Sequence, residues 1–188
     1  MSLLVLLGVV VLAVLWVIGT YNRLVGLRNQ TQNGWRQIDV QLKRRHDLIP
    51  NLVNTVKGAM DFEKGTLTAV MDARARAMSA AGPADASRKE GELTQAIGRL
   101  FAVAENYPQL KSNENVKMLQ EELSSTENKI GFARQFYNDI ATKFNIARET
   151  FPSSFIASMF GFTKAELFEI TDAAERAVPT VDLSMNKP

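Results

Sequence analysis

The sequence predicts an all-α fold in which an N-terminal transmembrane helix continues into an antiparallel up-and-down bundle of long helices. Three observations predict this fold. Residues 1–22 contain none of the chain's 22 basic and 20 acidic residues. Beyond them, apolar residues recur at intervals of three, four or seven, which is the spacing of a helix face rather than of a strand. The 6 prolines and 11 glycines are few for an all-β chain of 188 residues.

Residues 3–21 form the expected transmembrane helix. At about 1.5 Å per residue this uncharged run spans roughly 28 Å, close to the hydrocarbon thickness of a bilayer, which is about 30 Å. Trp16 and Tyr21 lie where an interfacial aromatic belt would fall. A cleaved signal peptide is the alternative, but no Lys or Arg precedes the run and residues 16–20 make a poor cleavage site. We therefore expect residues 1–21 to be retained as a transmembrane helix.

The basic residues after this run predict the orientation. Arg23 and Arg28 flank the membrane segment, and four more basic residues follow within residues 36–45, against one acid, Asp39. The more basic flank of a transmembrane helix tends to stay in the cytoplasm. We therefore expect a single-pass protein of the bacterial inner membrane with residues 22–188 on the cytoplasmic side. This rule is a bias, so the inverted orientation remains the alternative.

The first long helix is expected to run from the membrane to about residue 80. Pro50 interrupts its apolar stripe. Because a proline inside a helix removes one hydrogen bond and clashes with the preceding turn, we expect a kink or break at residues 48–50. Residues 79–83, Ser-Ala-Ala-Gly-Pro, then end the helix.

Two further long helices follow. Ser87 and Glu90 fit a capping box, so the second helix is expected to begin at Ser87 and to end at residues 106–108. The third is expected over about residues 113–150, where a coiled-coil heptad seam is the clearest apolar pattern in the chain. The seam residues are Val116, Leu119, Leu123, Thr126, Ile130, Ala133, Tyr137, Ile140 and Phe144. This seam packs inside its own bundle or pairs with another subunit, and both interpretations remain open.

Residues 151–163 form an uncharged segment rich in phenylalanine. We interpret it as a lid over the open end of the bundle or as a surface for the membrane or another subunit. Three antiparallel helices would carry it to the end of the bundle away from the membrane, so a neighbouring subunit is favoured over the membrane as its partner. A second capping-box pattern, Thr163 with Glu166, predicts one more short helix. Residues 184–188 are predicted to be a disordered tail.

Several uncommon sequence words resemble the bacterial LemA family. They are residues 21–22, 27–29, 35–53 (WRQIDVQLKRRHDLIPNLV), 56–58, 105–108 (ENYP), 110–111, 119–123 (LQEEL), 126–127, 133–134, 137–138, 160–162 (FGF) and 168–169. The resemblance covers about residues 20–183. It implies one N-terminal transmembrane helix, an α-helical bundle over residues 22–183, and no catalytic or cofactor residues. It also implies a link to envelope or internal-membrane organisation. The chain departs from the family at residues 59–63, which lack the family's frequent histidine.

Residues that carry chemistry are few. The chain has no cysteine, which excludes thiol catalysis and cysteine-ligated metals, and its only histidine is His46. The net charge of +2 disfavours a nucleic-acid partner. The common phosphate-binding, dinucleotide-binding, zinc-protease and serine-hydrolase motifs are absent. We therefore expect no enzymatic activity, no catalytic residue, no cofactor and no metal. His46 is expected to be structural rather than a pH sensor, and Asn51 and Asn138 to fix helix register.

The leading hypothesis is a non-enzymatic membrane protein that self-associates through its bundle and acts as a membrane scaffold or membrane-organising protein. Its expected partners are the lipid bilayer and further copies of itself. The basic triplet at residues 43–45 lies roughly 36 Å beyond Tyr21 along a straight helix, too far for headgroup contact. The candidate interface residues are Lys43, Arg44, Arg45, Asp47, Phe155, Phe160, Phe162 and Phe168. Charge reversal of Arg44 and Arg45 is expected to weaken assembly more than folding.

An alternative function is a monomeric or small-oligomer adaptor that regulates another membrane protein, such as a protease or a transporter. The two hypotheses differ in the mass of the purified protein, because a scaffold forms a particle of many subunits and an adaptor does not.

Overall fold

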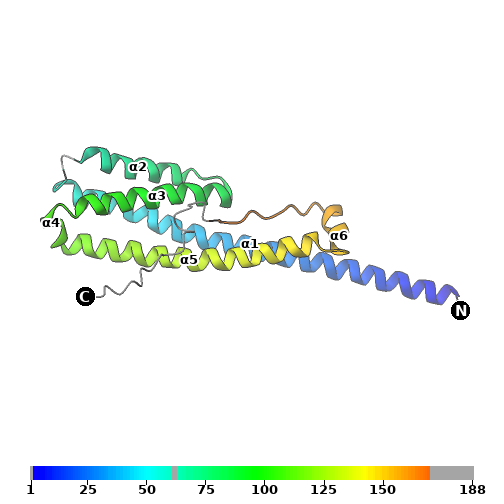
Figure 1. Ribbon diagram of the computed structural model, residues 1–188. Helices are drawn as coiled ribbons and strands as arrows, with labels where there is room; N and C mark the ends of the chain where they lie inside the picture. Colours follow the sequence, from blue (N-terminus) through cyan, green and yellow to red (C-terminus); the bar gives the residue numbers. More distant parts are fainter. Residues whose placement is uncertain (1, 61–62, 170–188) are drawn as a thin grey trace, which may run out of the picture.

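The protein is an elongated all-α molecule, which confirms the predicted fold class (Figure 1). The computed structural model describes residues 2–60 and 63–169. These residues form six helices and no strand. The helices are α1 (Ser2–Lys57), α2 (Lys64–Met78), α3 (Gly82–Ala104), α4 (Pro108–Lys111), α5 (Glu114–Glu149) and α6 (Ser153–Met159).

The α1 and α5 helices form the backbone of the molecule. They lie side by side in opposite directions, and the α2–α3 hairpin packs on the part of this pair that is far from Ser2 (Figure 1). There α1, α2, α3 and α5 make an up-and-down four-helix bundle, with α4 turning the chain from α3 into α5. Gly34 lets α1 and α5 approach closely, because a Cβ atom at this position would lie 3.4 Å from the Cα atom of Tyr137.

The N-terminal part of α1 is long and apolar enough to cross a membrane, judged by length and composition. None of the residues in its most apolar stretch is buried against the rest of the chain. The helix passes from this stretch into the bundle without a break.

The first long helix of the sequence prediction is in fact two helices. The α1 helix ends at Lys57 and α2 begins at Lys64, whereas Pro50 lies inside α1 and does not break it. Pro50 has no N–H for the carbonyl of His46, one turn earlier. The Nε atom of Arg74, on α2, donates to that carbonyl at 2.7 Å. A tertiary hydrogen bond thus replaces the missing helical one, which is why α1 continues past the proline.

The start of α3 also differs from the prediction, whereas the start of α5 agrees with it. The α3 helix begins at Gly82, and Ser87 lies inside it. The hydroxyl of Ser87 donates to the carbonyl of Glu169, so this serine serves a tertiary contact rather than a cap. At the start of α5, the Oδ1 atom of Asn113 accepts from two backbone amides at 2.9 and 3.3 Å, which caps the helix at the residue where it was expected to begin.

The additional helix changes where residues 151–163 lie. Because α1, α2 and α3 alternate in direction, α5 runs back toward the apolar part of α1 (Figure 1). The α6 helix therefore packs beside Tyr21 and Leu24, next to the predicted transmembrane segment. The sequence predicted three long helices instead of four, and an odd number of helices would have put this segment at the opposite end of the bundle.

Residues 163–169 are extended, whereas the Thr163 pattern predicted a helix there. Residues 162–169, which we call the strap, run back along α5 from α6 toward the α2–α3 hairpin (Figure 1). Side chains of α5 hold the strap's backbone, and these bonds take the place of helical ones. The predicted disordered tail, residues 184–188, lies outside the described residues.

The core is divided along the length of the molecule. The four-helix bundle encloses the largest cluster, which includes Ile49, Leu52, Val70, Leu93 and Leu100. A middle cluster contains Ile38, Ile130, Tyr137 and Phe168. The cluster nearest the apolar end contains Leu24, Phe144, Ile156 and Phe162. The α1–α5 pair thus extends beyond the bundle as a stalk that is covered on one side by the strap and α6.

Candidate functional site

A buried charged cluster joins α1, α3 and α5 inside the bundle. The Nη1 atom of Arg45 donates to Glu90 Oε2 at 3.1 Å, and its Nη2 atom donates to Thr94 Oγ1 at 2.6 Å. The same Nη2 atom lies 3.2 Å from Glu127 Oε2. His46 Nε2 is hydrogen-bonded to Glu90 Oε1 at 2.6 Å. One guanidinium therefore links three helices, and the single histidine of the chain belongs to the same network.

The arrangement of this cluster indicates a structural role. The side chains of Arg45 and Glu90 are only 5% and 6% exposed, and each is paired with other members of the cluster. A buried pair of this kind is costly to break, because removal of one partner leaves a buried charge uncompensated. Within the described part of the chain, no group of three or more His, Asp or Glu side chains is placed to hold a metal ion.

The rest of the basic triplet points to solvent. Lys43 and Asp47 are exposed. Arg44 Nη2 lies 2.7 Å from Glu122 Oε2 of α5, and both side chains are about half exposed. Such surface pairs contribute little to stability. Because Arg45 is buried while Arg44 is not, we expect charge reversal at Arg45 to disturb folding, and only charge reversal at Arg44 to report on assembly.

Aromatic side chains gather where the apolar part of α1 meets α6. The ring centroid of Tyr21 lies 4.7 Å from that of Phe160 and 5.9 Å from that of Phe162. Phe162 also contacts Phe144 of α5, at 6.3 Å. The guanidinium carbon of Arg28 lies 5.2 Å from the Phe162 ring centroid, in a cation–π contact. These contacts fix α6 against α1 at the end of the predicted transmembrane segment.

The structure divides the candidate interface residues into two groups. Arg45, Phe162 and Phe168 are buried within one chain and offer no surface to a second copy. The exposed members are Lys43, Arg44, Asp47, Phe155 and Phe160, and the exposed membrane-flanking residues are Trp16, Arg23 and Arg28. Phe168 packs on Trp35, with ring centroids 6.0 Å apart, in the middle cluster.

The strap is held by two asparagines one heptad apart on α5. Asn145 donates its Nδ2 to the carbonyl of Ala165 and accepts from the Ala165 amide, both at 2.9 Å. Asn138 bonds Phe168 in the same way, at 3.0 and 2.9 Å. Each amide side chain therefore pairs with the strap as a neighbouring strand would. Asn138 therefore positions the strap and does not fix helix register. Asn51, the other residue predicted to fix register, is exposed.

Tyr137 and Arg148 complete this attachment. The hydroxyl of Tyr137 donates to the carbonyl of Glu166 at 2.6 Å, and Arg148 Nε donates to the carbonyl of Phe162 at 2.8 Å. Burial, and then the negative charge of Glu166, raises the pKa of Tyr137 to about 12. The phenol therefore stays protonated and keeps donating over the physiological pH range.

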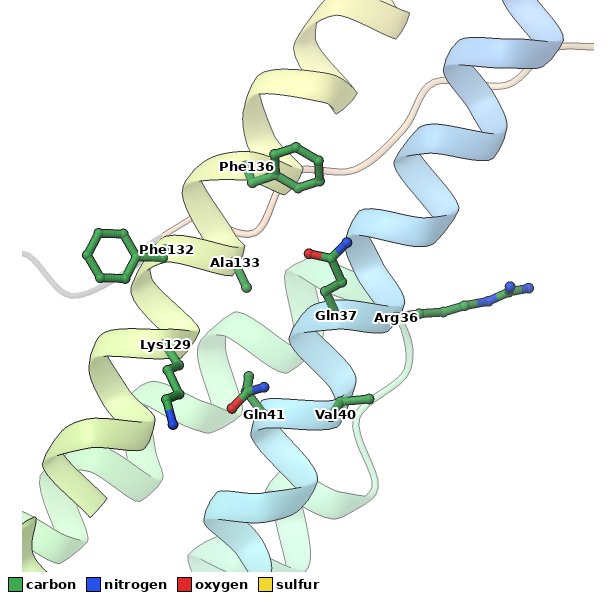
Figure 2. Close-up of a pocket in the computed structure, with 8 residues that line it drawn as sticks. All are labelled: Arg36, Gln37, Val40, Gln41, Lys129, Phe132, Ala133 and Phe136. Carbon is green, nitrogen blue, oxygen red and sulfur yellow. The ribbon is translucent and has the colours of Figure 1, made fainter. Parts of the chain in front are cut away.

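The side of the α1–α5 pair away from the α2–α3 hairpin carries an open groove between the two helices (Figure 2). Its volume is about 530 Å³. Val40, Phe132 and Phe136 are 62%, 75% and 48% exposed, so three large apolar side chains face solvent here. The Oε1 atom of Gln41 is buried in the structure without a hydrogen-bond partner in the described residues. We call the surface formed by Val40, Phe132 and Phe136 the open face.

The open face was not among the surfaces predicted from the sequence. Phe132 and Phe136 are spaced i, i+4 on α5 but fall outside the heptad seam, which uses Ile130, Ala133 and Tyr137. A second apolar row beside a seam is a signal that a helix has two packing faces. The row formed by Phe132 and Phe136 is therefore the sequence signal of the open face.

Comparisons with known proteins confirm the family resemblance. The LemA family profile matches residues 34–183. The chain is 26% identical over 189 residues to the magnetosome protein MamQ 2 of Paramagnetospirillum magneticum, covering 87% of this chain and 70% of the relative. It is 24% identical over 186 residues to the magnetosome protein MamQ of Magnetospirillum gryphiswaldense, covering 85% and 68%. It is 25% identical over 170 residues to protein LemA of Metamycoplasma hominis, covering 88% and 76%. Together with the apolar start of α1, these relatives indicate a membrane-associated protein.

Proposed function

The chain belongs to the LemA family, and we propose that it is a non-enzymatic membrane scaffold that self-associates through the open face. In this proposal α1 crosses the bacterial inner membrane once and the bundle lies on the cytoplasmic side. Arg23 and Arg28, exposed just beyond the apolar stretch, support that orientation. The relatives named as magnetosome proteins agree with a role at an internal membrane.

The single observation that carries self-association is the exposure of Val40, Phe132 and Phe136 around the groove between α1 and α5. Contiguous large apolar side chains on a protein surface mark sites of interaction, because their burial releases ordered water. The side chain of Gln41 also lines this groove, so it offers a polar amide group beside the apolar side chains. A further copy of the same chain is the occupant that we propose.

Anchoring supports a second copy as the partner. Copies held in one membrane share an orientation and are confined to two dimensions, which raises their effective concentration and lets weak contacts suffice. A closed assembly of such copies has its symmetry axis along the membrane normal. With the open face turned toward this axis, identical residues at the same depth come close, so Phe132 of one copy lies near Phe132 of the next.

The experiment that tests this proposal is the mass of the full-length protein in mild detergent, measured by size-exclusion chromatography with light scattering. We expect a uniform particle of many subunits. The Phe132→Glu/Phe136→Glu variant should shift to the monomer mass, because it places charges in an apolar contact. Met118→Glu is the matched control, since Met118 is an exposed apolar residue elsewhere on α5. It should leave the mass unchanged.

Each alternative gives a different result. A wild-type monomer contradicts self-association and favours an adaptor for another membrane protein. A particle that survives both charge substitutions contradicts the open face as its contact. Because the chain has no cysteine, Phe132→Cys in native membranes gives a second measurement. It should form a disulfide-linked dimer, whereas Arg99→Cys on the exposed side of α3 should not.

A further inference from the structure

We propose that residues 151–162, which we call the α6 turn, form a second membrane contact. In this inference its phenylalanine side chains insert into the lipid–water interface of the bilayer that α1 crosses. The inference rests on the proposed placement of α1 across the membrane. It adds a lipid-binding surface on the side of the membrane where the bundle lies.

The position of the α6 turn carries this inference. Tyr21 is at the end of the uncharged run of α1, where the hydrocarbon region of a bilayer gives way to the headgroups. The ring of Phe160 lies 4.7 Å from that of Tyr21, so it lies at the same depth. Val17, which is one turn deeper in the apolar run, also packs against this cluster. A bilayer around α1 therefore reaches the α6 turn without any movement of the chain.

The exposed surface of the α6 turn has the composition of a membrane contact. Residues 151–163 carry no charge. Phe151, Phe155, Met159 and Phe160 are all at least half exposed, the first three by 76%, 66% and 73%. Aromatic and long apolar side chains of this kind favour the interfacial region of a bilayer, because their free energy is lower there than in water.

The polar groups of the α6 turn are largely satisfied from within, which insertion into lipid requires. The amides of Phe155, Phe160 and Phe162 donate to carbonyls of the same turn, at 3.2, 3.1 and 2.9 Å. The hydroxyl of Ser153 donates to the carbonyls of Ala147 and Thr150, at 2.6 and 2.8 Å. Desolvation of this surface therefore leaves these backbone groups paired.

Cationic side chains frame the α6 turn at headgroup depth. Arg23 and Arg28 follow Tyr21 on α1, and Lys164 follows the turn on the strap; all three are exposed. Lipid phosphates complement such cations next to an inserted apolar segment. A second copy of the chain is a less suitable partner for the α6 turn than lipid. When α1 spans the membrane, lipid already surrounds the part of α1 that lies beside the turn.

The test uses depth-dependent quenching in the full-length protein. Single cysteines at exposed positions, Phe155→Cys and Met159→Cys, carry an environment-sensitive fluorophore, and no native cysteine interferes. The protein is reconstituted into vesicles of phosphatidylethanolamine and phosphatidylglycerol that contain a lipid spin-labelled near the headgroup. Leu12→Cys, within the apolar run, reports on the anchor. Phe132→Cys, an exposed apolar site on the open face, is the matched control.

We expect strong quenching and a blue-shifted emission at positions 155 and 159, and neither at position 132. Quenching by a lipid labelled near the chain end should be strong at position 12 and weak at positions 155 and 159. Quenching at position 12 without any at positions 155 and 159 overturns the α6 contact and leaves the anchor standing. A cross-link between two copies at position 155, without lipid quenching, shows a protein partner instead and also overturns it. Loss of quenching at all positions removes the anchor, and the α6 contact falls with it.

Discussion

Replacement of Glu90 by leucine should destabilise the bundle by about 3 kcal/mol, the lower end of the range for breaking a buried ion pair. Glu90 accepts from Arg45 at 3.1 Å and is hydrogen-bonded to His46 at 2.6 Å. Without Glu90, the guanidinium of Arg45, whose side chain is 5% exposed, keeps Thr94 and Glu127 as partners. Glu127 is half exposed, so it compensates the buried charge only in part.

The consequence is measurable by thermal unfolding of the full-length protein in mild detergent, followed by far-ultraviolet circular dichroism. For a chain of this size, about 3 kcal/mol lowers Tm by roughly 6–12 °C. The Arg45→Met/Glu90→Leu double variant should be less destabilised than the sum of its two single variants, because it removes both buried charges together. The surface control is Glu122→Gln, which breaks the exposed pair with Arg44 and should cost less than about 1 kcal/mol.

Two results would refute this reasoning. If Glu90→Leu melts with the wild type, the cluster does not hold its charges as the distances indicate. If the double variant shows the sum of the single losses, Arg45 and Glu90 are not coupled, and the link between α1 and α3 lies elsewhere.

Two further predictions concern the strap and the proline. The fold raises the pKa of Tyr137 from 10.0 to about 12. The protonated phenol therefore contributes its full stabilisation below pH 10. This contribution is lost as pH rises from 10 to 12, so the Tm of the wild type should fall further across this window than the Tm of Tyr137→Phe. Parallel curves of Tm against pH for the two proteins would contradict this prediction. Arg74→Met should cost about 1–3 kcal/mol, because the His46 carbonyl, which receives no N–H from Pro50, loses the donor on Arg74. Adding Pro50→Ala restores a backbone donor and should recover part of that loss in chemical unfolding; a purely additive double variant would argue against the replacement.

The features that the sequence predicted are those set by local pattern. The uncharged run before Arg23 and the apolar row from Val116 to Phe144 depend only on residues close in the chain, and both lie on long helices in the structure. Local patterns were also the source of the errors. Pro50 was expected to break a helix because its lost hydrogen bond is visible in the sequence, whereas the compensating donor on Arg74 is not.

Tertiary partners explain the other differences in the same way. The capping-box pattern at Thr163 is outweighed by two asparagines of α5, Asn138 and Asn145, whose side chains pair with the extended strap. Ser87 matches a cap but bonds the end of the strap instead. The end of α1 at Lys57 and the start of α2 at Lys64 changed the count of long helices from three to four. The α6 turn therefore lies beside the apolar part of α1 and not at the far end of the bundle.

The order of surfaces along α1 connects the two proposals. Val40 lies 19 residues beyond Tyr21 in the sequence, which is roughly 28 Å along a straight helix. In the proposed arrangement the α6 turn lies at the membrane, and the open face lies within this distance above it, level with the start of α3. An inserted α6 turn would add a second point of contact beside α1 and so limit rotation of the stalk about the helix axis. With that rotation limited, the open face points in a fixed direction in the membrane plane. Copies that meet in the plane then present matching faces, and the loss of rotational freedom on assembly is smaller. The lipid contact therefore favours the proposed self-association without taking part in it.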